Sequence, residues 1–163
     1  MSLKISNAIS DDQSFMRNSM IFNHLESAEL NFKKGMKNIQ LFEIGPIYNS
    51  SQSQENILSL LISSKDDTNS IYKSVNFNFY SLTELASKLI SSLNFDIKQF
   101  NISRSTSNIY HPGQSAEVHM GKKLISRYGK VHPLIMEEFP KLKNTYAIAV
   151  SYTHLTLPTI PQV

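Results

Sequence analysis

Two apolar segments separated by a few polar residues constrain the fold of this chain more than any other feature. Residues 38–48 (Asn-Ile-Gln-Leu-Phe-Glu-Ile-Gly-Pro-Ile-Tyr) carry apolar side chains at both alternating sets of positions, which predicts a strand covered on both faces. Glu55 to Ser63 is also β-like and is just long enough to pair back on the first segment. Because residues 50–54 form a polar turn between them, we expect an antiparallel hairpin.

Two amphipathic segments predict helices that cover this sheet. Residues 16–34 form the first, and Gly35 is placed to end it in the left-handed conformation. The second begins with a capping box, Ser81-Leu-Thr-Glu84, and Asn94 is a plausible end. The apolar stripes comprise Ile21, Leu25, Ala28 and Phe32, flanked by Met20 and His24, in the first helix, and Leu82, Leu85, Ala86, Leu89, Ile90 and Leu93 in the second.

The remaining residues predict further strands and one short helix. We expect a strand at 95–102, a hairpin that opens at His111-Pro-Gly-Gln and returns over 124–131, a short helix starting at Pro133, and a final strand at 145–150. Alternation of Ala116, Val118 and Met120 supports the first strand of that hairpin. Hairpins with helices between them predict an α+β fold, an antiparallel β-sheet flanked by helices.

Composition excludes several classes of protein. The chain has 163 residues, 40% of them hydrophobic, which is too much apolar material for a wholly disordered protein. No apolar run approaches the roughly 18 residues of a membrane span, and the absence of cysteine excludes disulfides, thiolate metal sites and a cysteine nucleophile. We therefore expect a soluble, cytoplasmic domain. A net charge of +3 without a clustered basic face argues against a small RNA-binding module.

Few residues are candidates for chemistry. There is no glycine-rich phosphate loop and no histidine pair with metal-ligand spacing. Glu43 is either a substrate or metal ligand or, as we favour, the partner of a basic residue such as Arg17. His111 and His132 each precede a proline, which holds them at bends, where they act as acid–base groups or, in the favoured interpretation, cap turns. Arg127 could bind a carboxylate or phosphate, although a solvent-facing position is favoured.

Several short stretches, taken in order, resemble one family. They are Asn7-Ala-Ile-Ser10, Met16-Arg-Asn-Ser19, Leu41-Phe-Glu-Ile-Gly-Pro-Ile-Tyr48, His111-Pro-Gly-Gln-Ser-Ala-Glu117 and Gly129-Lys-Val-His-Pro133. Together they resemble the catalytic-like core of the β chain of bacterial phenylalanyl-tRNA synthetase, over residues 1–149. The family-motif residues are Phe42, Glu43, Gly45, His111, Pro112, Gly113, His132 and Pro133.

The resemblance implies a degenerate catalytic module with the fold of a class II aminoacyl-tRNA synthetase. It implies no catalytic, cofactor-binding or metal-binding residue in this chain, since ATP and Mg²⁺ are bound by the α chain. The implied partners are that α chain in an (αβ)2 heterotetramer, and tRNA(Phe) through the whole complex. The first helix would lie at the subunit interface, with Met16, Arg17, Ile21 and Leu25 as candidate contacts.

The chain also departs from the family pattern. Asn7-Ala8 stands where the family usually has Asn-Pro, and Pro46 replaces a commonly basic residue. Residues 150–163 (VSYTHLTLPTIPQV) carry no charge and resemble a translated sequencing adapter, so we expect a non-native tail after an incomplete core domain at 1–149. The alternative function is a stand-alone enzyme that uses Glu43 with His111 or His132, which requires these side chains to converge in one cleft.

Overall fold

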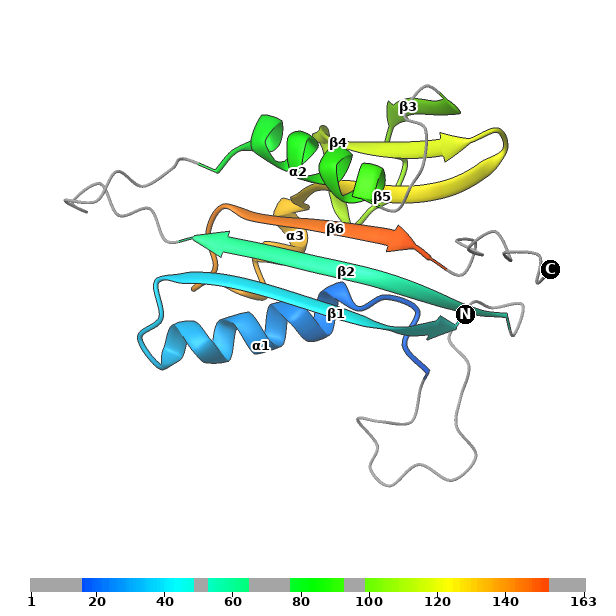
Figure 1. The fold of residues 1–163 in the computed structure, drawn as a ribbon. Helices are drawn as coiled ribbons and strands as arrows, with labels where there is room; N and C mark the ends of the chain where they lie inside the picture. Colours follow the sequence, from blue (N-terminus) through cyan, green and yellow to red (C-terminus); the bar gives the residue numbers. More distant parts are fainter. Residues whose placement is uncertain (1–15, 49–52, 65–76, 93–98, 153–163) are drawn as a thin grey trace.

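The computed structural model describes residues 16–48, 53–64, 77–92 and 99–152, which form a six-stranded antiparallel sheet with helices on both faces (Figure 1). The strand order is β1-β2-β6-β5-β4-β3, so the predicted α+β class is confirmed. Along the chain the elements are α1 (Ile21–Lys33), β1 (Asn38–Tyr48), β2 (Gln54–Ser64), α2 (Phe79–Ser92), β3 (Phe100–Arg104), β4 (Tyr110–Met120), β5 (Lys123–Val131), α3 (Pro133–Met136) and β6 (Thr145–Ser151).

The last strand in the sequence, β6, lies at the centre of the sheet between β2 and β5. It joins the β1–β2 hairpin to the antiparallel run of β3, β4 and β5, and it is anchored past its end by the Tyr152 N–H, which donates to the Asn56 carbonyl at 2.8 Å. Val150 and Ser151, which we expected in the tail, belong to β6, and Val150 is fully buried. Residues 153–163 lie outside the described residues.

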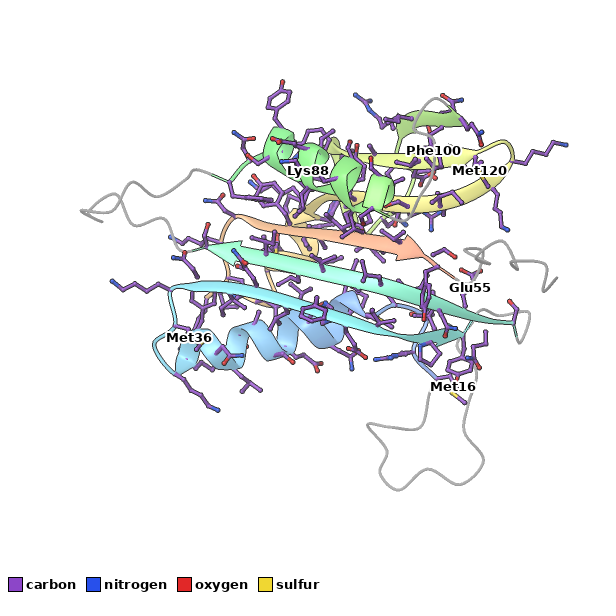
Figure 2. All side chains as sticks on the ribbon, in the orientation of Figure 1. Met16, Met36, Glu55, Lys88, Phe100 and Met120 are labelled. Atoms are coloured by element: carbon purple, nitrogen blue, oxygen red, sulfur yellow. The ribbon has the colours of Figure 1, made fainter. Side chains whose placement is uncertain are left out.

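The sheet separates two apolar clusters. On β6, Ala147 belongs to the cluster under α1 and α3, whereas its neighbours Tyr146 and Ile148 belong to the cluster under α2, because successive side chains point to opposite faces. Figure 2 shows side chains filling the spaces between the sheet and both long helices. The α1 face also contains Ile21, Leu25, Ala28, Ile39, Leu61, Tyr110, Val131, Phe139 and Leu142, and the α2 face contains Leu82, Ala86, Ile90, Ala116, Val118, Ile125, Tyr128 and Val150.

Helix α1 begins at Ile21, five residues later than the predicted start at Met16. The preceding segment instead runs beside the end of β1, where the Arg17 carbonyl accepts the Tyr48 N–H at 2.9 Å. The end of the helix is as predicted. Gly35 has a φ of +93°, and the N–H groups of Gly35 and Met36 return to the carbonyls of Phe32 and Asn31, the hydrogen-bond pattern of a Schellman motif.

The predicted capping box of the second helix is wrong. Asn78 lies just before α2, and its Oδ1 atom accepts the N–H groups of Tyr80 and Ser81 at 2.9 and 3.1 Å. Glu84 pairs with Lys88 at 2.6 Å instead of turning back to the helix start. Asn is a strong N-cap residue, so the helix begins two residues before Ser81. The predicted stripe is confirmed at Leu82, Ala86 and Ile90, and residues 93 and 94 lie outside the described ranges.

Strand β1 is an edge strand, and the prediction that both its faces are covered is wrong. Ile39 and Leu41 pack against the α1 cluster, whereas Phe42 is 74% exposed and Ile44 is 55% exposed. Among the described residues, the second apolar face of β1 is therefore left exposed.

The third strand begins at Phe100, later than the predicted 95–102, and residues 95–98 lie outside the described part. His111, Pro112 and Gly113 belong to β4, at a break in its register with β5 between Tyr110 and Ser115. The short helix at Pro133 is confirmed. Within the described ranges, no helix has the length and apolar composition of a membrane span.

Candidate functional site

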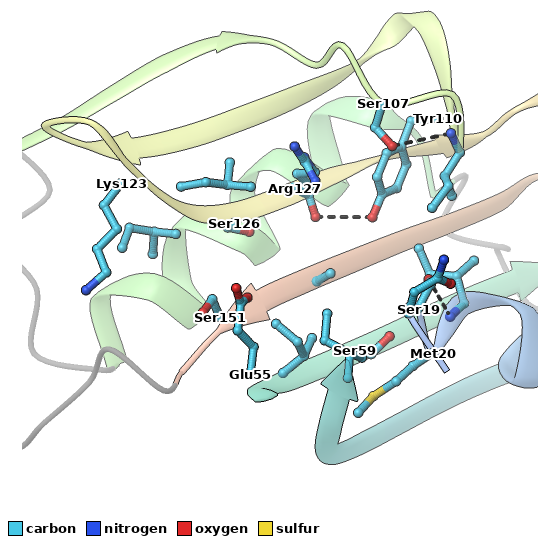
Figure 3. Close-up of a pocket in the computed structure, with 18 residues that line it drawn as sticks. Ser19, Met20, Glu55, Ser59, Ser107, Tyr110, Lys123, Ser126, Arg127 and Ser151 are labelled. Atoms are coloured by element: carbon cyan, nitrogen blue, oxygen red, sulfur yellow. Dashed lines mark hydrogen bonds between the residues drawn. The ribbon is translucent and has the colours of Figure 1, made fainter. Parts of the chain in front are cut away.

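A cavity of about 380 Å³ lies on the α1 side of the sheet (Figure 3). Ile57 and Ser59 of β2 and Ala149 and Ser151 of β6 contribute to its floor, and residues 18–21 and 107–110 contribute walls. The side chains of Ser59, Ala149 and Ser151 are small. The centre of the sheet therefore remains open on this face, where larger residues would have filled the space.

Charged residues border the cavity on two strands. Glu55 comes from β2, and Lys123 and Arg127 come from β5. Arg127 is not simply solvent-facing, because its Nε donates to the Glu117 carboxylate of β4 at 3.0 Å while its side chain remains 42% exposed. The same Glu117 oxygen accepts the Ser105 hydroxyl at 3.0 Å and the Thr106 N–H at 3.2 Å.

These contacts determine the charge state of Glu117, which is only 6% exposed. Burial on its own would raise the pKa of this carboxyl group. The hydrogen bonds from Thr106, Arg127 and Ser105, together with the attraction of Arg127, outweigh that effect and lower the pKa below its usual value. Glu117 is thus a buried, ionised carboxylate, and its Oε1 atom holds the loop after β3 against β4 and β5.

Glu43, the acid singled out from the sequence, forms the favoured ion pair. Arg17 Nη1 donates to Glu43 Oε1 at 2.7 Å, and Arg17 Nε donates to the Pro46 carbonyl at 2.9 Å. The second carboxylate oxygen lies 3.6 Å from His24 Nε2. Because β1 lacks a side chain at Gly45, the guanidinium can lie directly across the strand.

His24 connects this ion pair to the cavity. Its ring is buried on α1, and Nδ1 lies 3.4 Å from the Ser59 hydroxyl that lines the cavity floor. Burial lowers the pKa of His24, the attraction of Glu43 opposes that shift, and the charge of Arg17 reinforces it. The imidazole is therefore neutral near pH 7, and it links α1 to β1 and β2 through polar contacts.

His111 and His132 each cap a turn, as favoured from the sequence. His111 Nδ1 accepts the Gly113 N–H at 3.0 Å, and His132 Nδ1 accepts the Leu134 N–H at 3.2 Å at the start of α3. The structure does not bring either ring into a hydrogen-bonded group with Glu43, whose carboxylate contacts Arg17 and His24. It gives no support to an enzyme built on these three residues.

The predicted interface residues fall into two groups. Ile21 and Leu25 are buried in the core of the chain itself, so the exposed surface of α1 is formed by others, among them Phe22 and Leu30. Met16 and Arg17 are half-buried beside β1.

Sequence reasoning missed Glu117, Ser59 and the role of His24. An acid among apolar residues in a strand was a usable signal for Glu117, but its partners come from a separate loop and strand.

No group of three or more histidine, aspartate or glutamate side chains in the described ranges is arranged to hold a metal ion. The histidines that the structure describes contact a hydroxyl, a carboxylate or a backbone N–H.

Comparison with known proteins relates the chain to one family. A model of the phenylalanyl tRNA synthetase beta chain CLM domain matches residues 1–151. The phenylalanine–tRNA ligase beta subunit of Helicobacter pylori is 30% identical over 149 residues, covering 89% of this chain and 19% of the relative. That of Zymomonas mobilis is 28% identical over 138 residues, covering 83% and 18%. The chain thus spans less than a fifth of the length of these curated relatives.

Two solved structures of a pyrrolysyl-tRNA synthetase have a similar fold. The pyrrolysyl tRNA synthetase PylSc of Desulfitobacterium hafniense superposes with a TM-score of 0.66 at 14% identity, covering 89% of this chain and 50% of that one. A second structure of the enzyme from the same organism gives the same TM-score, covering 94% and 52%. At this identity the likeness concerns the fold, and it confirms the predicted class II synthetase-like architecture.

Proposed function

We propose that this chain, which belongs to the family of phenylalanyl-tRNA synthetase beta chain CLM domains, is a non-catalytic module that packs against the catalytic α chain of a phenylalanine–tRNA ligase. In this role it contributes to aminoacylation of tRNA(Phe) by supporting an (αβ)2 assembly in the cytoplasm. ATP and Mg²⁺ would be bound by the α chain.

The observation that carries this proposal is the exposed apolar edge formed by β1. The strand is 11 residues long, lies at the edge of the sheet, and exposes Phe42 and Ile44. A long apolar edge strand is an aggregation hazard unless something covers it. The strand contains one acidic residue, Glu43, whose charge is matched by Arg17, so little repels an incoming apolar surface.

Further exposed apolar side chains lie on α1 and in the turn after it. Phe22 is 39% exposed, Leu30 is 57% exposed, and Met36 at the turn into β1 is 57% exposed. Figure 2 labels Met36 in that turn. Phe22 also borders a groove shared with Leu134 and His132. Larger exposed apolar patches mark protein interaction sites, so these side chains are candidates for one. We name Phe22, Leu30, Met36, Phe42 and Ile44 together the α1–β1 surface.

The charges around the cavity support a non-catalytic role. An ATP site needs cations that are available to phosphate oxygens, and a carboxylate arrangement for Mg²⁺. Here Arg127 Nε is engaged by Glu117, Lys123 is a second cation on that side, and Glu55 lies on the opposite strand. These side chains are suited to holding the strands together and poorly suited to binding a triphosphate.

Co-purification tests the proposal. The chain is co-expressed with a tagged α chain from a bacterial phenylalanine–tRNA ligase, and the complex is analysed by size-exclusion chromatography with light scattering. We expect a complex containing both chains, and we expect Phe42→Ser combined with Ile44→Ser to weaken it by about tenfold or more, because central apolar contacts carry much of an interface's affinity.

The matched control is Ile102→Ser on β3. Ile102 is 56% exposed on the opposite edge strand, so it matches the single variant Ile44→Ser, which is measured beside the double variant. We expect it to leave the complex intact. Failure of the folded wild-type chain to bind at micromolar concentration, or equal weakening by the β1 and β3 variants, would contradict the proposal.

A further inference from the structure

We propose that His24 and Arg17 compete for Glu43, so that protonation of His24 releases the segment before α1 from the end of β1. This acid-sensitive latch lies within the chain. It therefore goes beyond the proposed packing role, and it can be tested without a partner. Its basis is the geometry around the His24 ring, the charges that face that ring, and the difference in exposure between the two cationic side chains.

The His24 ring fits its surroundings in one neutral form. Nδ1 lies 3.4 Å from the Ser59 hydroxyl, and Nε2 lies 3.6 Å from Glu43 Oε2. With the proton on Nε2, that nitrogen faces the carboxylate and Nδ1 accepts the Ser59 hydroxyl. A second proton, on Nδ1, would meet the hydroxyl hydrogen, so Ser59 would have to turn its hydrogen elsewhere. Because Ser59 is only 1% exposed, losing that acceptor is unfavourable.

Two charged groups act on this ring among the described residues. Glu43 comes from β1 and Arg17 from the segment before α1, whereas β2 presents the uncharged Ser59. The negative charge of Glu43 favours a proton on His24, and the positive charge of Arg17 opposes it. Coupling between two sites is reciprocal. A proton on His24 therefore opposes the contact of Arg17 with Glu43 by the same free energy.

Arg17 is the cation that can leave. Its side chain is 29% exposed, whereas that of His24 is 6% exposed and is held in the core by α1. Water can solvate a detached guanidinium, but the imidazole has no such route. Release would also break the bond from Arg17 Nε to the Pro46 carbonyl. It would weaken the neighbouring backbone bond, in which the Tyr48 N–H donates to the Arg17 carbonyl at 2.9 Å.

The competition predicts opposite effects of two substitutions on His24. Arg17→Met removes the opposing charge and should raise the pKa of His24, whereas Glu43→Gln removes the favourable charge and should lower that pKa. NMR of the histidine ring signals in the full 163-residue chain measures both, over about pH 5 to 8. Arg104→Met on exposed β3 and Glu84→Gln on α2 are matched controls, which should leave the pKa of His24 unchanged.

Hydrogen exchange tests the release itself. The Arg17 Nε–H and the Tyr48 N–H are followed in wild type and in His24→Gln, and the two chains are compared at the same pH so that intrinsic exchange rates cancel. The ratio of wild-type to variant rates should rise at least about threefold from about pH 7.5 to pH 5, because only wild type carries a group that protonates at this site. The rise should follow the pKa of His24 measured from its ring signals.

An exchange ratio that stays constant with pH would overturn the proposal. So would a His24 pKa that Arg17→Met leaves unchanged, or that Arg104→Met raises equally. Amide spectra first show whether each variant is folded. If Arg17→Met does not fold, the exchange comparison between wild type and His24→Gln decides, and if His24→Gln does not fold, the comparison of the two arginine variants decides.

Discussion

Arg17 Nη1 lies 2.7 Å from Glu43 Oε1, and this pair fastens the segment before α1 to the middle of the edge strand β1. The same guanidinium donates to the Pro46 carbonyl, so one side chain spans the strand at two points. Both partners keep about a third of their surface in solvent (29% and 38% exposed), which limits the energy of the pair. The contact thus positions the segment before α1 on β1 and adds little to the stability of the fold.

Glu43→Gln removes the charge and preserves the shape of the side chain. We expect the free energy of unfolding to fall by about 1 kcal/mol, because a half-exposed ion pair is screened by solvent. Urea denaturation monitored by circular dichroism measures the change. Glu84→Gln is the control, since Glu84 pairs with Lys88 on the exposed side of α2, and it should have no measurable effect. Equal losses in the two variants would contradict a specific role for Glu43.

Gly45→Ala should disturb the same contact from the strand side. A Cβ atom at this position would lie 2.6 Å from Arg17 Nη2 and 3.2 Å from Met20 Cε. Arg17 cannot withdraw without losing its bonds, so we expect a loss of about 1–2 kcal/mol. In an Arg17→Met background the same substitution should cost clearly less. A double-mutant cycle measures this coupling, and additive losses would show that Gly45 is not required for the guanidinium.

His24 predicts a pH dependence of stability. Its pKa is lowered in the folded state, chiefly by burial, so below the unfolded pKa of about 6.5 the unfolded chain binds more protons than the folded one. Stability should therefore be full above that pH and decrease as the pH falls towards the folded pKa. Urea denaturation between pH 5 and 8 measures the slope, with those limits chosen to bracket a histidine titration of about 6.5. His24→Gln should flatten it, and an unchanged slope would assign the effect to another group.

Gly129→Ala should be strongly destabilising, because the added Cβ would meet atoms that cannot move aside. It would lie 2.7 Å from the Gln114 carbonyl oxygen and 2.9 Å from the Ser115 Cα atom, which are backbone atoms of the neighbouring strand. We expect a loss of about 2 kcal/mol or more. Gly113→Ala is the control, since its nearest contact would be 3.4 Å from the His111 ring. Comparable denaturation midpoints for the two variants would contradict this account.

Prediction from the sequence succeeded where the determinants are local. The stop of α1 at Gly35 depends on one residue's conformational freedom, and the caps at His111 and His132 depend on atoms two residues away. It failed for the start of α2, where Asn78 is a competing cap three residues before Ser81. It also failed for β1, because alternating apolar residues look the same whether a strand is covered within the chain or lies exposed at an edge.

The sequence by itself determined which segments form strands and helices and that their pairing is antiparallel, and it favoured a basic partner such as Arg17 for Glu43. Only the tertiary structure decided the order of the strands, because β6 enters between β2 and β5 from far along the chain. That insertion brings Ala149 and Ser151 beside Ile57 and Ser59 and creates the cavity. Contacts between distant strands depend on the order in which the strands pair in the sheet, and no local pattern of residues encodes that order.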